Sequence, residues 1–248
     1  MIGPISNSLD VSISRRRWLG AGGATALAFG AAPLAAAEAP APPRIEPTTL
    51  EPAAALKMLY QGNRRFVAGE TIEPHRNLSR LKEIAERQTP FAAFLGCADS
   101  RVPIEILFDQ GFGDLFVTRI AGNVATSENI GSLEFGTQVL GAKVLFVLGH
   151  TNCGAVAATM KRDPVPGQIS SLFQFIRPAV RGVRGGVNDA VRENVRLQAQ
   201  TLAEASPVLA DLIRVGKLLV AGGVYDLATG LVTPVPLNGP DDGAGGLG

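Results

Sequence analysis

The chain has 248 residues, 46% of them hydrophobic, and a formal net charge of +1 at pH 7. This length and apolar content suit one globular domain of about 200 residues with additional terminal segments. The near-neutral charge gives no electrostatic reason to expect nucleic acid or an anionic membrane surface as a partner.

The first 37 residues have the pattern of an export signal. Residues 14–19 (SRRRWL) resemble the twin-arginine motif, with Trp18 where phenylalanine is usual. The Gly/Ala-rich apolar stretch that follows is too short and too weakly hydrophobic to be a retained membrane span. Residues 35–37 (AAA) supply a small-residue cleavage pattern. We therefore predict a twin-arginine signal peptide, a periplasmic mature protein and no stable membrane anchor after processing; an alanine-rich leader or an uncleaved anchor is the alternative.

The rest of the chain is predicted to hold one domain, residues 49–236, between a linker (38–48) and a flexible C-terminal tail (237–248). Its first half alternates helices and strands. We expect helices over 50–67, with Thr49 as cap and Pro52 in the first turn, over 78–87, and over 128–141, with Ser127 as cap. Apolar runs predict strands over 91–96, 114–120 and 143–149.

Further helices are predicted near 153–160, 168–180 and 188–205, and one after the Ser206-Pro207 pair that ends by Gly216. A fourth strand is expected within 217–225 and an edge strand within 231–235. This alternation predicts a single α/β domain with a central, mostly parallel sheet flanked by helices. We expect four parallel strands in the order 2-1-3-4, with a possible antiparallel edge strand.

Two polar segments directly follow predicted buried strands. Residues 97–101 (CADSR) follow the first strand, and residues 150–154 (HTNCG) follow the third. Together they hold both cysteines of the chain and one of its two histidines. Because the carboxyl ends of parallel strands meet at one edge of a sheet, Cys97, His150 and Cys153 are expected to converge there. Two thiolates and an imidazole form a three-ligand zinc site whose fourth position is open, which is typical of catalytic zinc.

Two cysteines in an exported protein would by default suggest a disulfide. Each cysteine here lies in its own ligand-like segment, so we favour zinc over a disulfide and over a purely apolar core role. Twin-arginine export carries folded proteins, so zinc can be bound before the oxidising periplasm is reached. Gly154 is expected to let the backbone turn closely, and helix amides to favour the Cys153 thiolate.

Asp99 and Arg101 lie beside the first cysteine. An ordinary loop ion pair, which contributes little, is one interpretation. In the other, Asp99 accepts the proton of a zinc-bound hydroxide and orients it, while Arg101 keeps the carboxylate ionised and aimed. If the pair broke, Asp99 could bind zinc and expel the water.

Three segments resemble the β-class carbonic anhydrases in order and spacing: residues 97–103 (CADSRVP), 119–123 (RIAGN) and 150–155 (HTNCGA). The resemblance extends from about Leu50 to Val235. It implies one zinc ion per subunit on Cys97, His150 and Cys153, with Asp99 and Arg101 as a dyad. The implied reaction is the reversible hydration of CO2 to bicarbonate and a proton.

The same resemblance implies a homodimer with active sites at the interface, often assembled into homotetramers. It places Gln88 in a hydrogen bond to substrate or bicarbonate and Phe116 in the apolar substrate pocket; Gly154 is counted with these substrate-binding residues. A capping glutamine and a core aromatic are the alternatives for Gln88 and Phe116.

The chain departs from the family pattern at two positions. Ile120 replaces a polar residue, for which we expect a local change in packing. Phe94 stands where a subset of the family has a tryptophan of an inhibitory bicarbonate site, although Tyr225 resembles another member of that site. Phe94 therefore weakens the expectation of that regulation.

Other functions remain open at this stage. The same zinc site could hydrolyse carbonyl sulfide or carbon disulfide, and a non-catalytic zinc domain would have four protein ligands. His75 is the remaining histidine and a candidate proton shuttle, in what reads as an exposed loop. Arginines between 177 and 196 form a basic stretch without interleaved aromatics, which favours a solvated or subunit-facing helix surface over a nucleic-acid site.

Overall fold

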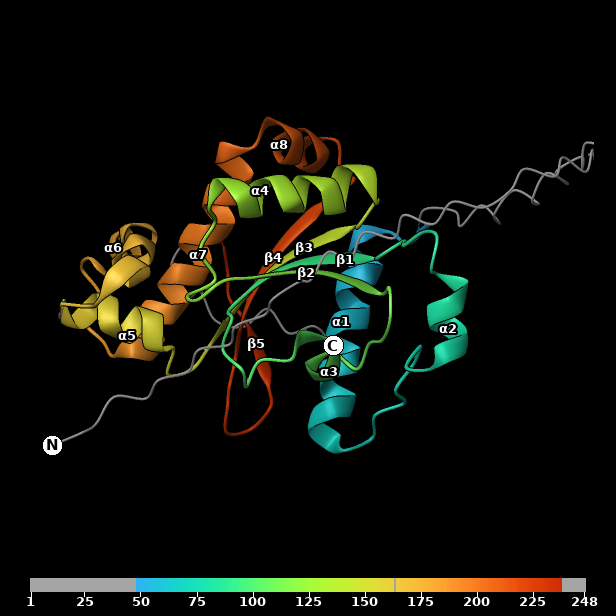
Figure 1. Ribbon diagram of the computed structural model, residues 1–248, viewed down its shortest axis with the longest axis horizontal. Helices are drawn as coiled ribbons and strands as arrows, with labels where there is room; N and C mark the ends of the chain where they lie inside the picture. The colour runs from blue at the N-terminus through green and yellow to red at the C-terminus, as the bar shows by residue number, and fades with distance from the viewer. Residues whose placement is uncertain (1–47, 163, 238–248) are drawn as a thin grey trace, which may run out of the picture. The chain divides into compact units, whose positions relative to one another are not determined.

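The computed structural model describes residues 48–162 and 164–237, which contain a five-stranded sheet with helices on both faces (Figure 1). The strand order is β2-β1-β3-β4-β5. The first four strands are parallel, and β5 runs antiparallel to β4. The strands are β1 (Ala92–Gly96), β2 (Leu115–Arg119), β3 (Val144–His150), β4 (Leu219–Tyr225) and β5 (Val232–Pro234). The predicted fold class and strand order are confirmed.

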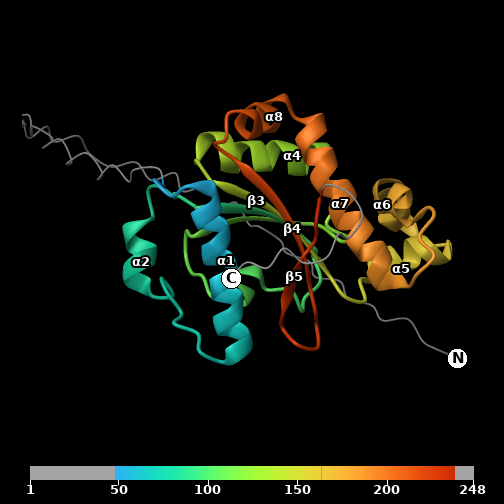
Figure 2. The same cartoon turned by 180° about the vertical axis from the view of Figure 1, so that it is seen from behind.

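Helices cover both faces of this sheet. One face carries α1 (Pro52–Ala68) and the short α3 (Ile104–Leu107), and the other carries α4 (Ser127–Glu134) and α7 (Val187–Ala205). Figure 2 looks toward the β4–β5 edge, with α1 on one side of the strands and α7 on the other. The remaining helices are α2 (Leu78–Glu83), α5 (Gly154–Lys161), α6 (Phe173–Val180) and α8 (Pro207–Arg214).

The central strands are buried on both faces. Every residue of β1 and β3 is buried, as expected for parallel strands covered by helices on each side. Beneath α1 and α3, the rings of Phe94 and Phe146 stack at 5.3 Å and both contact Phe108. These rings form part of the core cluster on this face of the sheet. By contrast, β2 at the sheet edge is partly exposed along its whole length.

Several helix boundaries differ from the predictions. Glu51, not Thr49, precedes α1, although Pro52 opens the helix as expected. The second helix ends at Glu83, four residues early, and Thr126 rather than Ser127 caps α4. The helix predicted to reach 141 continues from α4 as a π-helix, Phe135–Val139. Ser206 does cap α8, because its hydroxyl accepts a hydrogen bond from Leu209 N at 3.0 Å.

The predicted signal peptide, all of the linker except Thr48, and all of the tail except Leu237 lie outside the described residues. Within residues 48–162 and 164–237, none of the helices has the length and apolar character needed to cross a bilayer.

Candidate metal centre

Cys97, His150 and Cys153 meet at the carboxyl edge of the sheet. The ligand atom that each offers lies within 4.8 Å of the other two, and all three residues are buried. Neither cysteine forms a disulfide. The structure therefore brings together the three side chains that the sequence singled out, from segments about 50 residues apart.

Strand register explains this convergence. Gly96, the last residue of β1, pairs with Leu148 of β3, so Cys97 leaves the sheet beside the final residues of β3. His150 is itself the last residue of β3, one residue beyond the predicted end of this strand. Asn152 then takes a left-handed conformation (φ 55°), and Cys153 becomes the N-cap of α5.

The orientation of His150 leaves one ring nitrogen free for a ligand. Its Nδ1 lies 3.0 Å from the Thr151 carbonyl oxygen, and since a carbonyl can only accept, Nδ1 carries the proton. Nε2 is buried and has no hydrogen-bond partner among the described residues. A buried imidazole nitrogen without a partner is costly unless something binds it. A backbone carbonyl on the other ring nitrogen is the usual support for a metal-binding histidine.

The two thiols influence each other strongly. Hydrogen bonding to the neighbouring Cys153 thiol, opposed by burial and supported by His150, lowers the pKa of Cys97 to about 4. Conversely, Cys97 and burial raise the pKa of Cys153. Burial alone would lower the pKa of His150, but the adjacent Cys97 thiolate raises it. The cluster thus favours a thiolate, and a divalent metal ion can take the place of the remaining thiol proton and neutralise the negative charge. Two sulfurs and one nitrogen in this arrangement fit zinc, which accepts this donor set in catalytic sites.

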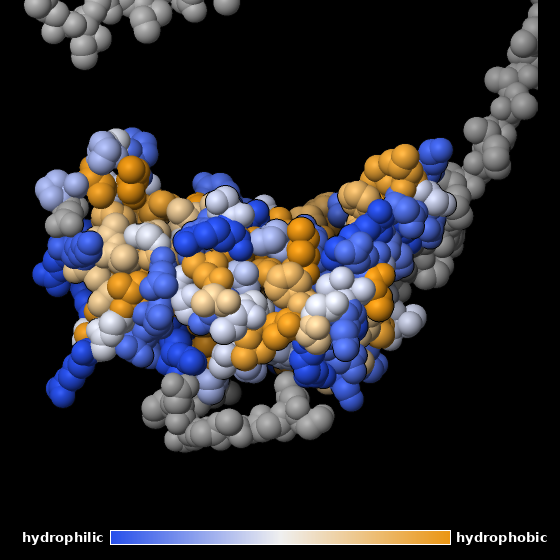
Figure 3. Space-filling view, turned by 90° about the horizontal axis from the view of Figure 1, so that it is seen from below, coloured by the Kyte–Doolittle hydropathy of each residue, from blue (hydrophilic) through white to orange (hydrophobic). Residues whose placement is uncertain are grey.

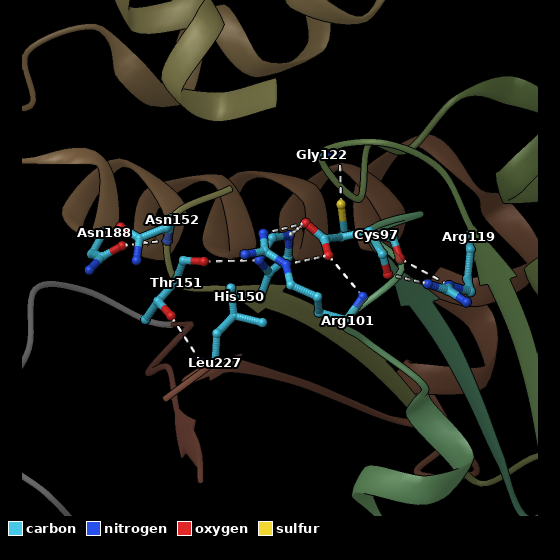
Figure 4. A network of polar contacts seen from close by, with 10 residues as sticks. Cys97, Arg101, Arg119, Gly122, His150, Thr151, Asn152, Asn188 and Leu227 are labelled. Carbon is cyan, nitrogen blue, oxygen red and sulfur yellow. Dashed lines mark hydrogen bonds and ion pairs between the residues drawn. The ribbon is translucent and has the colours of Figure 1, made fainter. Parts of the chain in front are cut away.

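The Asp99 carboxylate lies beside this cluster and is held by Arg101. Arg101 Nε donates to Asp99 Oδ1 at 2.9 Å and Nη2 donates to Oδ2 at 2.7 Å, while the Arg101 backbone N–H also donates to Oδ1 at 2.9 Å. These bonds hold the pKa of Asp99 well below its usual range. Asp99 Oδ2 is 3.8 Å from His150 Nε2. An ionised carboxylate is therefore fixed next to the free histidine nitrogen. Figure 4 shows this network of polar contacts, with Cys97, Arg101 and His150 labelled.

The loop after β2 supports the cluster from a second side. Gly122 N–H points at Cys97 Sγ, 3.3 Å away, and Gly122 O accepts from Asn194 Nδ2 at 2.9 Å. Gln198 in turn joins Asn194 to the backbone at Ala125. Both α7 side chains are buried. Sequence reasoning missed these two residues because nothing in a helical pattern marks a buried amide as a support rather than a surface residue.

The remaining predicted residues do not all reach the cluster within one chain. Gln88 precedes β1 whereas Cys97 follows it, so the five-residue strand, about 16 Å long, separates them. Phe116 lies on the edge strand β2, where it pairs with Ala93 of β1, and its ring centroid is 6.3 Å from that of Phe135.

Two other residues also differ from expectation. Gly154 opens α5 next to Cys153, but a Cβ there would meet open space, so the tight turn falls on Asn152 instead. His75 Nδ1 lies 2.7 Å from Oδ1 of Asp114, the residue that precedes β2. This contact is at the end of the sheet opposite His150, away from the metal cluster.

Comparisons with known proteins agree with this chemistry. Residues 92–232 match the family model described as carbonic anhydrase. The carbonic anhydrase of Mycolicibacterium smegmatis is 38% identical over 189 residues, covering 73% of this chain and 92% of that protein. The Coccomyxa β-carbonic anhydrase solved with acetazolamide is 29% identical (TM-score 0.56; 73% of this chain, 86% of that one). A tetrameric β-carbonic anhydrase from Sordaria macrospora has a similar fold (TM-score 0.57, 21% identity; 62% and 85%).

Proposed function

This chain belongs to the β-class carbonic anhydrases, and we propose that it catalyses the reversible hydration of CO2 to bicarbonate and a proton at a zinc ion held by Cys97, His150 and Cys153. One observation carries the assignment of the site. The buried, unpartnered Nε2 of His150 faces two cysteines and lies 3.8 Å from a carboxylate that Arg101 holds ionised.

Zinc bound by these residues would lower the pKa of a water molecule to about 7 and so supply a hydroxide nucleophile at neutral pH. The chain's own contribution is orientation. Arg101 donates to both Asp99 oxygens, which keeps the carboxylate ionised and leaves it able to accept a hydrogen bond from a nearby hydroxyl group. With Asp99 paired in this way, three protein atoms are available to the ion and a fourth position stays open for solvent.

Substrate contacts are proposed to come from a second subunit. Gln88 lies about one strand length from Cys97 in its own chain, so hydrogen bonding to substrate requires a neighbouring copy. Phe116 would likewise line the CO2 pocket of a neighbouring copy rather than that of its own chain. The partly exposed β2 edge leaves room for such packing, and hydrophobic side chains reach the surface between hydrophilic ones on the face in Figure 3. We propose a homodimer or homotetramer; the Sordaria relative is tetrameric.

We also propose that residues 1–37 direct twin-arginine export and that the mature enzyme works in the periplasm. Support comes from the SRRRWL run and the AAA pattern before Glu38. Fractionation of cells that make the full chain tests this, with Arg15→Lys/Arg16→Lys/Arg17→Lys as the matched variant. A mature form starting at Glu38 in the periplasm is expected, and its persistence in the triple variant would contradict the proposal.

The catalytic proposal is tested by stopped-flow CO2 hydration with the zinc-loaded protein lacking residues 1–37. Activity is expected to rise across about pH 6.5 to 9, the range in which zinc-bound water ionises. Parallel assays with carbonyl sulfide and carbon disulfide separate the alternative hydrolase function. Hydrolysis of carbonyl sulfide or carbon disulfide without CO2 hydration would favour the hydrolase function over the proposed one. Absence of CO2 hydration by protein that contains one zinc ion per chain would refute the proposal.

A further inference from the structure

Arg119, the last residue of β2, joins the edge of the sheet to the loop that carries Cys97 and Asp99. Its Nε donates to the Cys97 carbonyl oxygen at 2.9 Å, and its Nη2 donates to the Asp99 carbonyl oxygen at 2.6 Å. Figure 4 shows Arg119 reaching this loop from the side opposite His150. One guanidinium thus binds the backbone at a metal ligand and at the dyad carboxylate.

The position of Arg119 follows from where the strand ladder stops. Gly96 pairs with Arg119, and Ile120 N donates to Gly96 O at 3.1 Å. Beyond Gly96 the chain leaves the sheet, and within the described residues Arg119 is the donor found for the Cys97 carbonyl. A planar guanidinium with several fixed N–H groups can bind two such carbonyls at once. Arg119 therefore supplies side-chain hydrogen bonds to this loop beyond the point where the backbone ladder between β1 and β2 ends.

Cys97 and Asp99 depend on Arg119 to different degrees. The Cys97 sulfur has a separate hydrogen bond from Gly122, and the residue directly follows the buried β1 strand. The Asp99 carboxylate is held by Arg101, which is 58% exposed and lies on the same loop. Arg101 can therefore fix Asp99 relative to the loop, but not the loop relative to the sheet.

We infer that Arg119 is a positioning residue, which holds the Asp99 carboxylate at its distance from the ligands on β3 by fixing the 97–101 loop to the end of β2. This inference rests on the proposed carbonic anhydrase reaction and deepens it. Arg119 touches backbone atoms rather than substrate, so its removal is expected to act on turnover more than on substrate binding. A misplacement of about 1 Å of a catalytic group can lower the rate roughly 100-fold.

The test compares Arg119→Met with Arg119→Lys, and uses Arg177→Met as a control for the loss of an exposed arginine on α6. Arg119→Met is expected to lower kcat about 10- to 100-fold, with KM changed less than about twofold and one zinc ion retained per chain. Arg119→Lys, which keeps donors and charge, is expected to recover part of kcat. Arg177→Met should behave as the unchanged protein.

Hydrogen exchange in the zinc-free protein supplies a measurement that is independent of turnover. The amides of Arg101 and Val102, which donate within this loop, are expected to exchange faster in Arg119→Met than in the unchanged protein. Unaltered exchange together with unaltered kcat would overturn the inference, and so would equal loss of zinc and activity in both Arg119 variants. If the unchanged zinc protein does not hydrate CO2, the proposed function fails, whereas the exchange result still decides whether Arg119 anchors the loop.

Discussion

Asp99 Oδ2 lies 3.8 Å from Nε2 of His150, while Arg101 donates to both oxygens of the same carboxylate. The carboxylate is close enough to influence whatever His150 binds, and each of its oxygens also accepts a hydrogen bond from the guanidinium. This separates the ligand role, which belongs to the histidine, from the orienting role, which belongs to the aspartate.

Replacing Asp99 with asparagine should separate metal binding from turnover. Asp99→Asn keeps the size of the side chain but replaces the charged hydrogen-bond acceptor with a neutral amide, so kcat is expected to fall roughly 100-fold, with one zinc ion per chain retained. Zinc analysis and stopped-flow CO2 hydration measure the two properties. Asp211→Asn, an exposed member of an ion pair with Arg214, is the control. Near-normal hydration by Asp99→Asn would remove its orienting role.

The cysteines should be reduced and bound to zinc in the active protein. We expect one zinc ion per chain, and two thiols that react with a thiol reagent only after the metal is chelated, because both are buried in the metal cluster. His150→Ala should lose most bound zinc. Mass spectrometry under non-reducing conditions checks the thiols, and a Cys97–Cys153 disulfide in fully active protein is incompatible with the proposed site.

Glycine 122 should be more sensitive to substitution than another glycine of similar backbone conformation. Gly122 has φ +77°, and a Cβ there would lie 2.6 Å from Ile176 Cδ1. Gly167 has φ +59° with open space around it. Gly167→Ala is expected to cost about 1 kcal/mol of unfolding free energy from backbone strain alone.

Gly122→Ala should cost more, about 2–4 kcal/mol, and should weaken zinc binding, because Gly122 N–H faces the Cys97 sulfur. Denaturant unfolding and zinc competition with a chelator measure both effects. Equal destabilisation by the two alanines would show that the close approach to Ile176 does not matter.

Acid should destabilise the fold through Asp109, which follows α3 and is not one of the candidate metal ligands. The Asp109 side chain is fully buried, which alone would raise its pKa, but Arg65 and the amides of Ile72 and Glu73 lower it overall. Its stabilisation is therefore complete above the unfolded pKa of about 3.9 and is lost as the pH falls from there through the folded value.

Asp109→Asn should lower the unfolding free energy at neutral pH by about 2 kcal/mol and make stability less dependent on pH below about 4. Urea unfolding between pH 2 and 7 measures this dependence. A variant with the same acid sensitivity as the unchanged protein would show that another carboxylate is responsible.

Much of this molecule could be predicted from sequence because its signals are local. The apolar runs before Cys97 and His150 are long enough to identify buried strands, and parallel strands must end at a common edge. Periodicity also located most helices. It did not predict the change to a π-helix after Glu134, because a π-helix bonds each amide to the carbonyl five residues earlier, a difference that apolar spacing does not mark.

The rest of the site depends on long-range contacts that no local pattern encodes. Arg119 was visible only as part of a motif, since its two carbonyl partners lie about 20 residues away. The tautomer of His150 is set by the hydrogen bond to the Thr151 carbonyl. This bond could not be predicted without the backbone conformation at the end of β3. For Gln88, the sequence suggested a role that one chain cannot perform, because strand β1 stands between it and Cys97.

A zinc ion bound as proposed would join Cys97 and His150, which lie about 50 residues apart in the sequence, and would act as a cross-link as well as a cofactor. On the same reasoning as for a disulfide, this cross-link would lower the entropy of the unfolded chain by the equivalent of roughly 4 kcal/mol. Under the proposed export of the folded chain, the ends of β1 and β3 would already be joined, without a disulfide that oxidising surroundings would have to form.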